Sequence, residues 1–177
     1  MERRIAIELR MPSPGLLVGY AAVFDAQSRD LGGFTESVRS GAFTRSLSNA
    51  DHICALYDHD GKSVLGRVGA GTLKLEEDRR GLRFEIQLPP TSVGKDLAAL
   101  VERQDVAGAS FAFTVPKGGD TWHREGRALH RELREVNLHE ITVTANPAYP
   151  DTTVAKRHIP ARHPRLNVAL CYLETVE

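Results

Sequence analysis

Short apolar segments with a period of two are the feature that most constrains the fold of this chain. In the clearest one, Leu82, Phe84, Ile86 and Leu88 alternate with polar residues, so every second side chain lies on one face. Similar segments, separated by Gly, Pro and Asp turns, occupy 5–9, 16–24, 53–57, 65–75, 106–115, 128–136 and 138–144. This pattern predicts an α+β, β-rich fold, built as a closed or nearly closed, mostly antiparallel β-barrel with flanking helices.

Two segments have helical spacing instead. Phe43 and Leu47 are four residues apart, which predicts a helix over 41–48 with Ser40 as its N-cap. A second helix is predicted over 93–104 because its apolar residues form one stripe. The stripe consists of Val93, Leu97, Leu100 and Val101.

The end of the sequence differs from the rest. Residues 156–165 hold four Lys or Arg residues, two prolines and no acid. Proline is a poor fit to a helix or a strand. We therefore expect one domain over 1–155, followed by a basic linker and C-terminal tail at 156–177.

Charge and hydropathy exclude several classes of partner. The chain has 23 Lys and Arg and 23 Asp and Glu among 177 residues, so its formal net charge is zero. This balance argues against a nucleic-acid partner bound by broad phosphate neutralisation. No apolar run approaches the roughly 20 residues needed to span a bilayer, and the N-terminus lacks the apolar region of a signal peptide. We expect neither a nucleic-acid nor a membrane partner.

The cysteines and histidines give no sign of a metal or a cofactor. Cys54 and Cys171 are far apart, and no pair of histidines has metal-ligand spacing. A thiol enzyme using Cys54 is a poor hypothesis, because a thiol within an apolar strand stays protonated and inert. We expect no metal, no cofactor and reduced thiols.

Ser110 is the first candidate for chemistry. Strand alternation puts Phe111 on one face and Ser110 on the other, among small residues. The aromatic face belongs against a core, and the bare serine face leaves room for a peptide. The alternative is that small residues there merely let a helix pack closely.

His59 and Glu140 are the second and third candidates. His59 ends an apolar strand and begins a turn, where an imidazole suits general-base work; the alternative is a solvated turn histidine. Glu140 lies beside His139 inside an apolar strand, and a buried carboxylate needs a partner. That partner is either the ring of His59 or a surface arginine. Alternation puts Glu140 on the face of Leu138 and His139 on the other face, and it does not decide which of the two points at a site.

Five motifs, taken together and in this order, resemble the prohead proteases of tailed bacteriophages, the capsid-maturation serine proteases related to herpesvirus assemblin. The resemblance covers about residues 15–155. The motifs are Glu36 with Ser40-Gly41-Ala42-Phe43; Leu56-Tyr57-Asp58-His59-Asp60 with Leu65-Gly66-Arg67; Glu77-Asp78 with Gly81-Leu82; Gly108-Ala109-Ser110-Phe111-Ala112-Phe113; and Leu138-His139-Glu140-Ile141-Thr142-Val143-Thr144 with Asn146-Pro147-Ala148-Tyr149.

The resemblance implies an assemblin-like fold and a Ser-His-Glu triad of Ser110, His59 and Glu140, with His139 as a possible alternative third member. It also implies a serine endopeptidase that cleaves the scaffold, or the scaffolding domain of the major capsid protein, and itself. Such an enzyme acts as a homo-oligomer inside the procapsid, in the bacterial host cytoplasm. Where this chain has Ala112 the family usually has Gly, which favours an alternative: a weak or inactive assembly module with the same fold.

Overall fold

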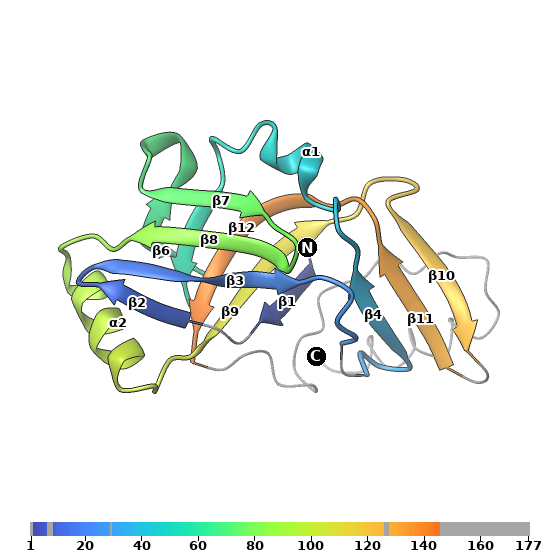
Figure 1. Cartoon of the computed structure of the whole chain (residues 1–177), viewed down its shortest axis with the longest axis horizontal. Helices are drawn as coiled ribbons and strands as arrows, with labels where there is room; N and C mark the ends of the chain where they lie inside the picture. Colours follow the sequence, from blue (N-terminus) through green and yellow to red (C-terminus); the bar gives the residue numbers. More distant parts are fainter. Residues whose placement is uncertain (1, 7–8, 29, 126–127, 146–177) are drawn as a thin grey trace.

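The computed structural model describes residues 2–6, 9–28, 30–125 and 128–145 (Figure 1). The predicted linker and tail at 156–177 lie outside these residues. The strands are β1 (Glu2–Ala6), β2 (Leu9–Ser13), β3 (Leu16–Val23), β4 (Phe34–Val38), β5 (Cys54–Tyr57), β6 (Asp60–Arg67), β7 (Leu73–Glu77), β8 (Gly81–Gln87), β9 (Gly108–Thr114), β10 (Asp120–Glu125), β11 (Ala128–Leu133) and β12 (Asn137–Thr144). The helices are α1 (Thr44–Leu47), the 3-10 segment η1 (Val68–Ala70) and α2 (Ser92–Glu102).

The strands form three sheets. A five-stranded sheet has the order β1-β9-β12-β5-β6, a four-stranded sheet the order β2-β3-β8-β7, and a three-stranded sheet the order β10-β11-β4. Most neighbours are antiparallel, but β12 runs parallel to β5, and β11 runs parallel to β4. The predicted closed barrel is therefore wrong: among the described strands the sheets are mixed and open. Alternation fixes which faces are apolar, but it does not specify whether the edges of a sheet meet.

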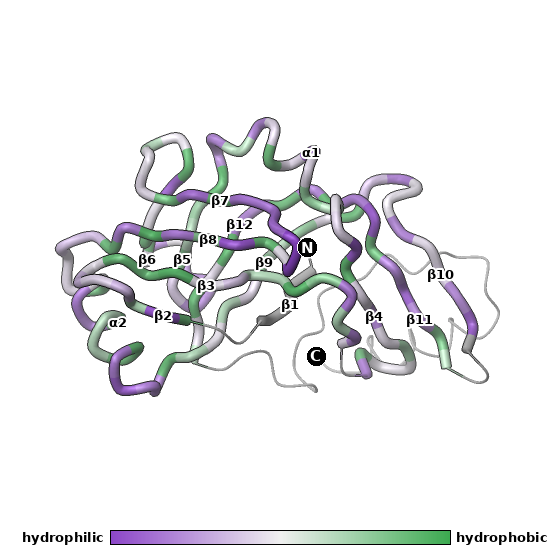
Figure 2. Tube along the Cα trace, viewed as in Figure 1, coloured by the Kyte–Doolittle hydropathy of each residue, from purple (hydrophilic) through white to green (hydrophobic). Residues whose placement is uncertain are grey.

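The five-stranded and four-stranded sheets pack face to face around the core. In Figure 1, β3 and β8 cross in front of β9 and β12. Phe111 from the first sheet stacks on Phe113 at 5.0 Å and contacts the edge of Phe43 at 5.3 Å between ring centroids. Phe84 and Ile86 of β8 belong to the same buried cluster. Figure 2 shows hydrophobic stretches along β3 and mostly hydrophilic ones along β10 and β11, although Leu133 at the end of β11 belongs to the buried cluster.

The two helices differ in how well the sequence predicts them. Helix α2 begins one residue before the predicted start, with Thr91 as N-cap, and buries Leu97 and Val101. Helix α1 is much shorter than predicted, and its N-cap is Phe43, so Ser40 as N-cap is wrong. A phenylalanine cannot cap with its side chain, so the first helical N–H groups need another acceptor.

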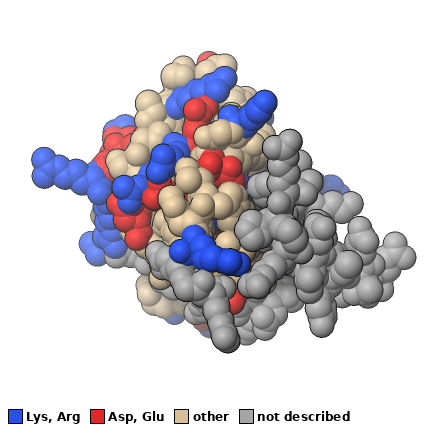
Figure 3. All heavy atoms as spheres, turned by 90° about the vertical axis from the view of Figure 1, so that its right-hand side faces the viewer, with Lys and Arg blue, Asp and Glu red and all other residues tan. Residues whose placement is uncertain are grey.

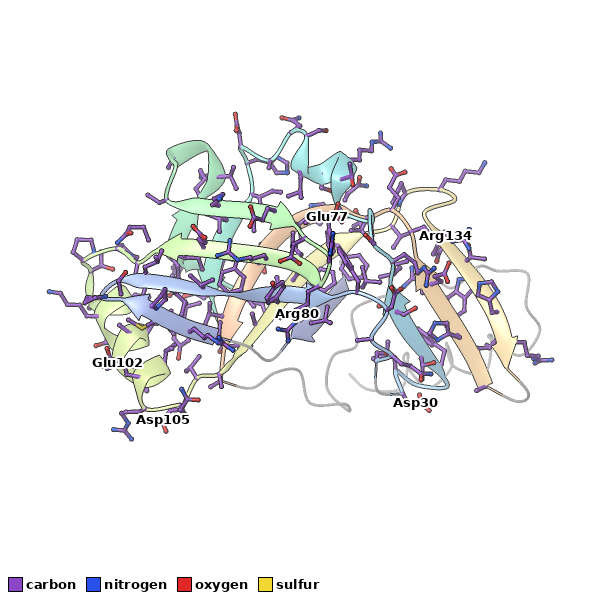
Figure 4. All side chains as sticks on the ribbon, viewed as in Figure 1. Asp30, Glu77, Arg80, Glu102, Asp105 and Arg134 are labelled. Atoms are coloured by element: carbon purple, nitrogen blue, oxygen red, sulfur yellow. The ribbon has the colours of Figure 1, made fainter. Side chains whose placement is uncertain are left out.

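That acceptor comes from a distant strand. Figure 4 shows Glu77, at the end of β7, close to the start of α1. One oxygen of its carboxylate accepts from the backbone N–H of Phe43 at 3.0 Å, and the other accepts from the Thr44 hydroxyl at 2.7 Å. Two of the five motifs, one containing Glu77 and one containing Phe43, therefore meet to fix α1 against the four-stranded sheet.

The three-stranded sheet contains two strands that alternation does not reveal, β4 and β10. Its inner face carries a buried ion pair: Arg131 Nη1 lies 3.2 Å from Glu36 Oε2, and Arg131 Nε lies 2.8 Å from Asp120 Oδ2. The Arg131 and Glu36 side chains are only 3% and 1% exposed. The Arg131 guanidinium also stands 5.6 Å from the centre of the Trp122 ring. Charge pairs to Arg131 of β11 thus link it to Glu36 of β4 and Asp120 of β10.

We predict that Arg131→Met destabilises the protein by about 3–5 kcal/mol, because it leaves buried carboxylates without their guanidinium. Chemical denaturation measures this change. The matched control is Arg39→Met, whose ion pair with Asp25 is half exposed and is expected to contribute less than about 1 kcal/mol. Equal unfolding midpoints for Arg131→Met and the unmodified chain would contradict the prediction.

Figure 3 looks onto the end of the molecule that carries the three-stranded sheet, and acidic and basic side chains intermingle over its described part. Local pairs such as Arg134 with Glu132, at 2.6 Å, account for part of this mixing. Opposite charges therefore lie close to one another on the described part of this face. Among the described residues, no helix is both long enough and apolar enough to cross a bilayer.

Candidate active site

Strand β9 presents Ser110 as the alternation predicts. Phe111 points into the core and is 1% exposed, so Ser110 and Ala112 lie on the other face of the sheet. In the antiparallel register with β12, Ser110 is opposite Thr142, and Ala112 is opposite Glu140. These four residues (Ser110, Ala112, Glu140 and Thr142) share one surface of the sheet, which we call the serine face.

A β-bulge at His139 brings Glu140 onto the serine face. The register shifts between Leu138, which is opposite Phe113, and Glu140, so His139 is the extra residue. The predicted placement of Glu140 with Leu138 is therefore wrong, because one inserted residue reverses the alternation. His139 Nε2 lies 3.0 Å from the Thr114 hydroxyl, and loss of hydration around the ring lowers the pKa of His139. Its hydrogen-bond partner is thus a threonine at the end of β9.

His59 occupies a strained two-residue turn. Asp58 and His59 connect β5 to β6, with Tyr57 paired to Asp60, and both turn residues have positive φ, 51° and 58°. Positive φ at both central positions matches the type I′ hairpin turn. Left-handed backbone costs roughly 1–3 kcal/mol for a residue other than glycine and persists only where surrounding contacts hold it.

Strand β12 supplies those contacts. The Asp58 N–H donates to the Val143 carbonyl at 2.9 Å, and the Thr144 hydroxyl donates to the Asp58 carboxylate at 2.7 Å. The His59 N–H donates to Thr142 Oγ1 at 2.9 Å. The turn is therefore fixed against the strand that also carries Glu140.

The ring of His59 is bonded to Glu140. Nδ1 of His59 lies 2.6 Å from Oε1 of Glu140, and the two side chains are only 14% and 15% exposed. An ionised carboxylate only accepts, so in a neutral imidazole this bond puts the proton on Nδ1 and the lone pair on Nε2. That is the tautomer a general base needs. The sequence left either the ring of His59 or a surface arginine as the partner of Glu140. In the structure the partner is the ring of His59.

Ser110 itself is buried, so the expectation of a bare face with room for a peptide is not met in this structure. Its side chain is 1% exposed, and among the described residues its Oγ is buried without a hydrogen-bond partner. It lies one strand away from the His59 turn, because Thr142 is at once its register partner and the acceptor for the His59 N–H. The structure thus brings His59 and Glu140 into contact and places Ser110 on the same side of the sheet, without a hydrogen bond between Ser110 and His59.

Two residues with a role at this site are not predicted from the sequence. Thr142 and Thr144 hold the turn through their hydroxyl groups. The sequence feature that could have revealed them is the alternation of Glu140, Thr142 and Thr144 along one strand. Polar side chains at every second position of a strand that is otherwise apolar mark a face with its own partners.

Cys54 lies closer to the candidate site than its apolar neighbours suggest. It is paired with Glu140 in the parallel register of β5 and β12, and it is half-buried rather than buried. Its thiol donates to the His52 carbonyl at 3.6 Å. Cys171 is outside the described residues.

A histidine that is hydrogen-bonded to a carboxylate, with a serine one strand away on the same face of the sheet, provides the residue types of a serine hydrolase. A comparison with protein-family models matches residues 7–163 to the family of caudovirus prohead serine proteases. The chain belongs to this family, and its class is that of the phage capsid-maturation proteases. The family resemblance predicted from the five motifs is confirmed.

A solved structure with a similar fold is the capsid assembly protease of bacteriophage T4. The match has a TM-score of 0.51 and 9% sequence identity, and it covers 81% of this chain and 99% of the other. At this identity the likeness concerns the fold alone. It supports the β-rich, protease-like part of the fold prediction, while the closed barrel is not found. A comparison with curated protein sequences gave no match.

Proposed function

We propose that this chain is a serine endopeptidase in which Ser110 is the nucleophile, His59 the general base and then acid, and Glu140 the carboxylate that orients the histidine. The observation that carries the proposal is the 2.6 Å bond between His59 Nδ1 and Glu140 Oε1, next to the serine face. Membership of the prohead serine protease family supports the reaction class.

The chemistry follows from these roles. Nε2 of His59 takes the proton of the Ser110 hydroxyl as Oγ attacks the scissile carbonyl, and the Glu140 carboxylate stabilises the imidazolium that forms. His59 then gives the proton to the leaving amine, which leaves an acyl group on Ser110. A water, deprotonated by His59, hydrolyses the ester and restores the serine. Because Ser110 is 1% exposed, a peptide can reach Oγ only after the atoms that cover it move aside.

The substrates we propose are the scaffold, or the scaffolding domain of the major capsid protein, and the enzyme itself. Cleavage inside the procapsid would let small fragments leave before the shell matures. Membership of the prohead protease family supports this choice. Ala112, whose methyl group shares the serine face with Glu140, is the residue that would favour an inactive assembly module instead.

We predict that the major capsid protein of the same phage, or its scaffold, becomes shorter when it is produced together with this chain. Mass spectrometry of the intact proteins measures the change and gives the cleaved bond. The same capsid protein produced alone serves as the control. Full-length capsid and scaffold proteins in assembled procapsids that contain the folded chain would contradict the proposal and favour the assembly module.

A further inference from the structure

We infer that Thr142 is a positioning residue, whose buried hydroxyl holds the backbone of His59 so that one strand, β12, sets both the ring and the main chain of the base. The inference rests on the proposed function, because positioning matters only if His59 acts on Ser110. Thr142 is fully buried, with 0% of its surface exposed, and it lies directly opposite Ser110 in the sheet.

Three residues of β12 bind the turn at three different points. Glu140 binds the ring of His59 at 2.6 Å, Thr142 accepts from the His59 backbone N–H at 2.9 Å, and Thr144 donates to the Asp58 carboxylate at 2.7 Å. Residues two apart in a strand share one face, so the three form a single row. A ring and a backbone held from the same strand cannot shift independently of each other.

The second hydrogen bond of Thr142 fixes the direction of the first. Its hydroxyl donates to the Leu56 carbonyl at 3.1 Å, which commits its one hydrogen and leaves the oxygen lone pairs for the His59 N–H. For the same reason Thr142 donates no bond to its register partner Ser110. The β-branched side chain also has few rotamers, so the oxygen stays where the turn needs it.

The strained conformation of the turn explains why the backbone of His59 needs a hydrogen-bond partner on β12. His59 has φ of 58°, a conformation that must be maintained by surrounding contacts. If the acceptor at Thr142 is removed, a partly buried N–H loses its partner and the turn is free to relax. Relaxation would swing the imidazole away from its working orientation, and catalysis is sensitive to displacements of that size.

Thr142→Val tests the inference, because valine keeps the shape and removes the hydroxyl. We expect kcat for cleavage of the capsid precursor to fall about tenfold, the effect of one lost hydrogen bond. KM should stay near its original value. In the NMR spectrum, the strongly deshielded Nδ1–H signal of the short His59–Glu140 bond should broaden or disappear. Thr142→Ser, which restores the hydroxyl, should recover both kcat and the signal.

Controls separate positioning from stability. Thr35→Val removes a hydroxyl that is bonded to His130 at 2.9 Å in the three-stranded sheet, and it should leave kcat and the His59 signal unchanged. If Thr142→Val does not fold, Thr144→Val is the second variant, with the same direction of change expected. An unchanged NMR signal and unchanged kcat in the folded variant would overturn the inference, as would a failure of Thr142→Ser to restore them.

Failure of the proposed function is distinguishable from failure of this inference. The NMR measurement does not depend on cleavage activity. It reports whether the hydroxyl of Thr142 keeps the ring of His59 hydrogen-bonded to Glu140. An inactive unmodified chain whose signal still depends on Thr142 would contradict the proposed function alone. An active chain whose signal and kcat do not depend on Thr142 would contradict the inference alone.

Discussion

Ser110→Ala is expected to lower the rate of capsid-precursor cleavage by about 10⁴-fold or more, because it removes the hydroxyl that we propose forms the acyl-enzyme. Stability should not fall. The Ser110 hydroxyl is buried without a hydrogen-bond partner among the described residues, so its removal relieves a desolvated polar group. Cleavage assays and thermal unfolding of the purified variant measure the two effects.

Ser46→Ala is the matched control for this result. The Ser46 hydroxyl donates to the Val136 carbonyl at 2.7 Å and accepts from the Leu138 N–H at 2.9 Å. Its loss should cost about 1 kcal/mol of stability and leave cleavage intact. If Ser110→Ala cleaved as fast as the unmodified chain, Ser110 would not be the nucleophile.

Glu140→Gln is expected to lower kcat by about 10³- to 10⁴-fold while the fold stays intact. The amide has almost the same shape as the carboxylate, but it can neither stabilise an imidazolium nor enforce the Nδ1–H tautomer. The measurement is the pH dependence of kcat/KM for the variant and the unmodified chain. A loss confined to KM would contradict an orienting role for Glu140.

His139→Ala compares the two candidates for the third member directly. His139 contacts the Thr114 hydroxyl, whereas Glu140 contacts the ring of His59. We therefore expect His139→Ala to retain most of the activity that Glu140→Gln loses. Equal losses in the two variants would contradict the assignment of Glu140.

The sequence predicts the strands around the candidate site well. Phe111 is buried and Ser110 lies on the opposite face, because β9 has an apolar side and a small-residue side. The turn at His59 also follows from the end of an apolar run before Asp58 and Asp60. Local alternation and turn residues decide these features, and both can be read without knowing the partners of each strand.

Features set by partners from distant parts of the chain could not be predicted. The strands β4 and β10 carry polar residues and are joined through the buried Arg131 with Glu36 and Asp120. The bulge at His139 is defined only by the register of β12 against β9. The parallel pairing of β12 with β5, which brings Glu140 to His59, is likewise a choice of neighbour that no local pattern specifies.

The distance between Ser110 Oγ and His59 Nε2 tests the central claim most directly. It can be measured in a crystal structure of the enzyme with a peptide boronic acid bound, because boron mimics the tetrahedral carbon that the nucleophile attacks. We predict boron bonded to Ser110 Oγ, with Nε2 about 2.6–3.2 Å from that oxygen and Nδ1 still on Glu140. Boron on another side chain, or Nε2 well beyond hydrogen-bond reach of Ser110, would contradict the account.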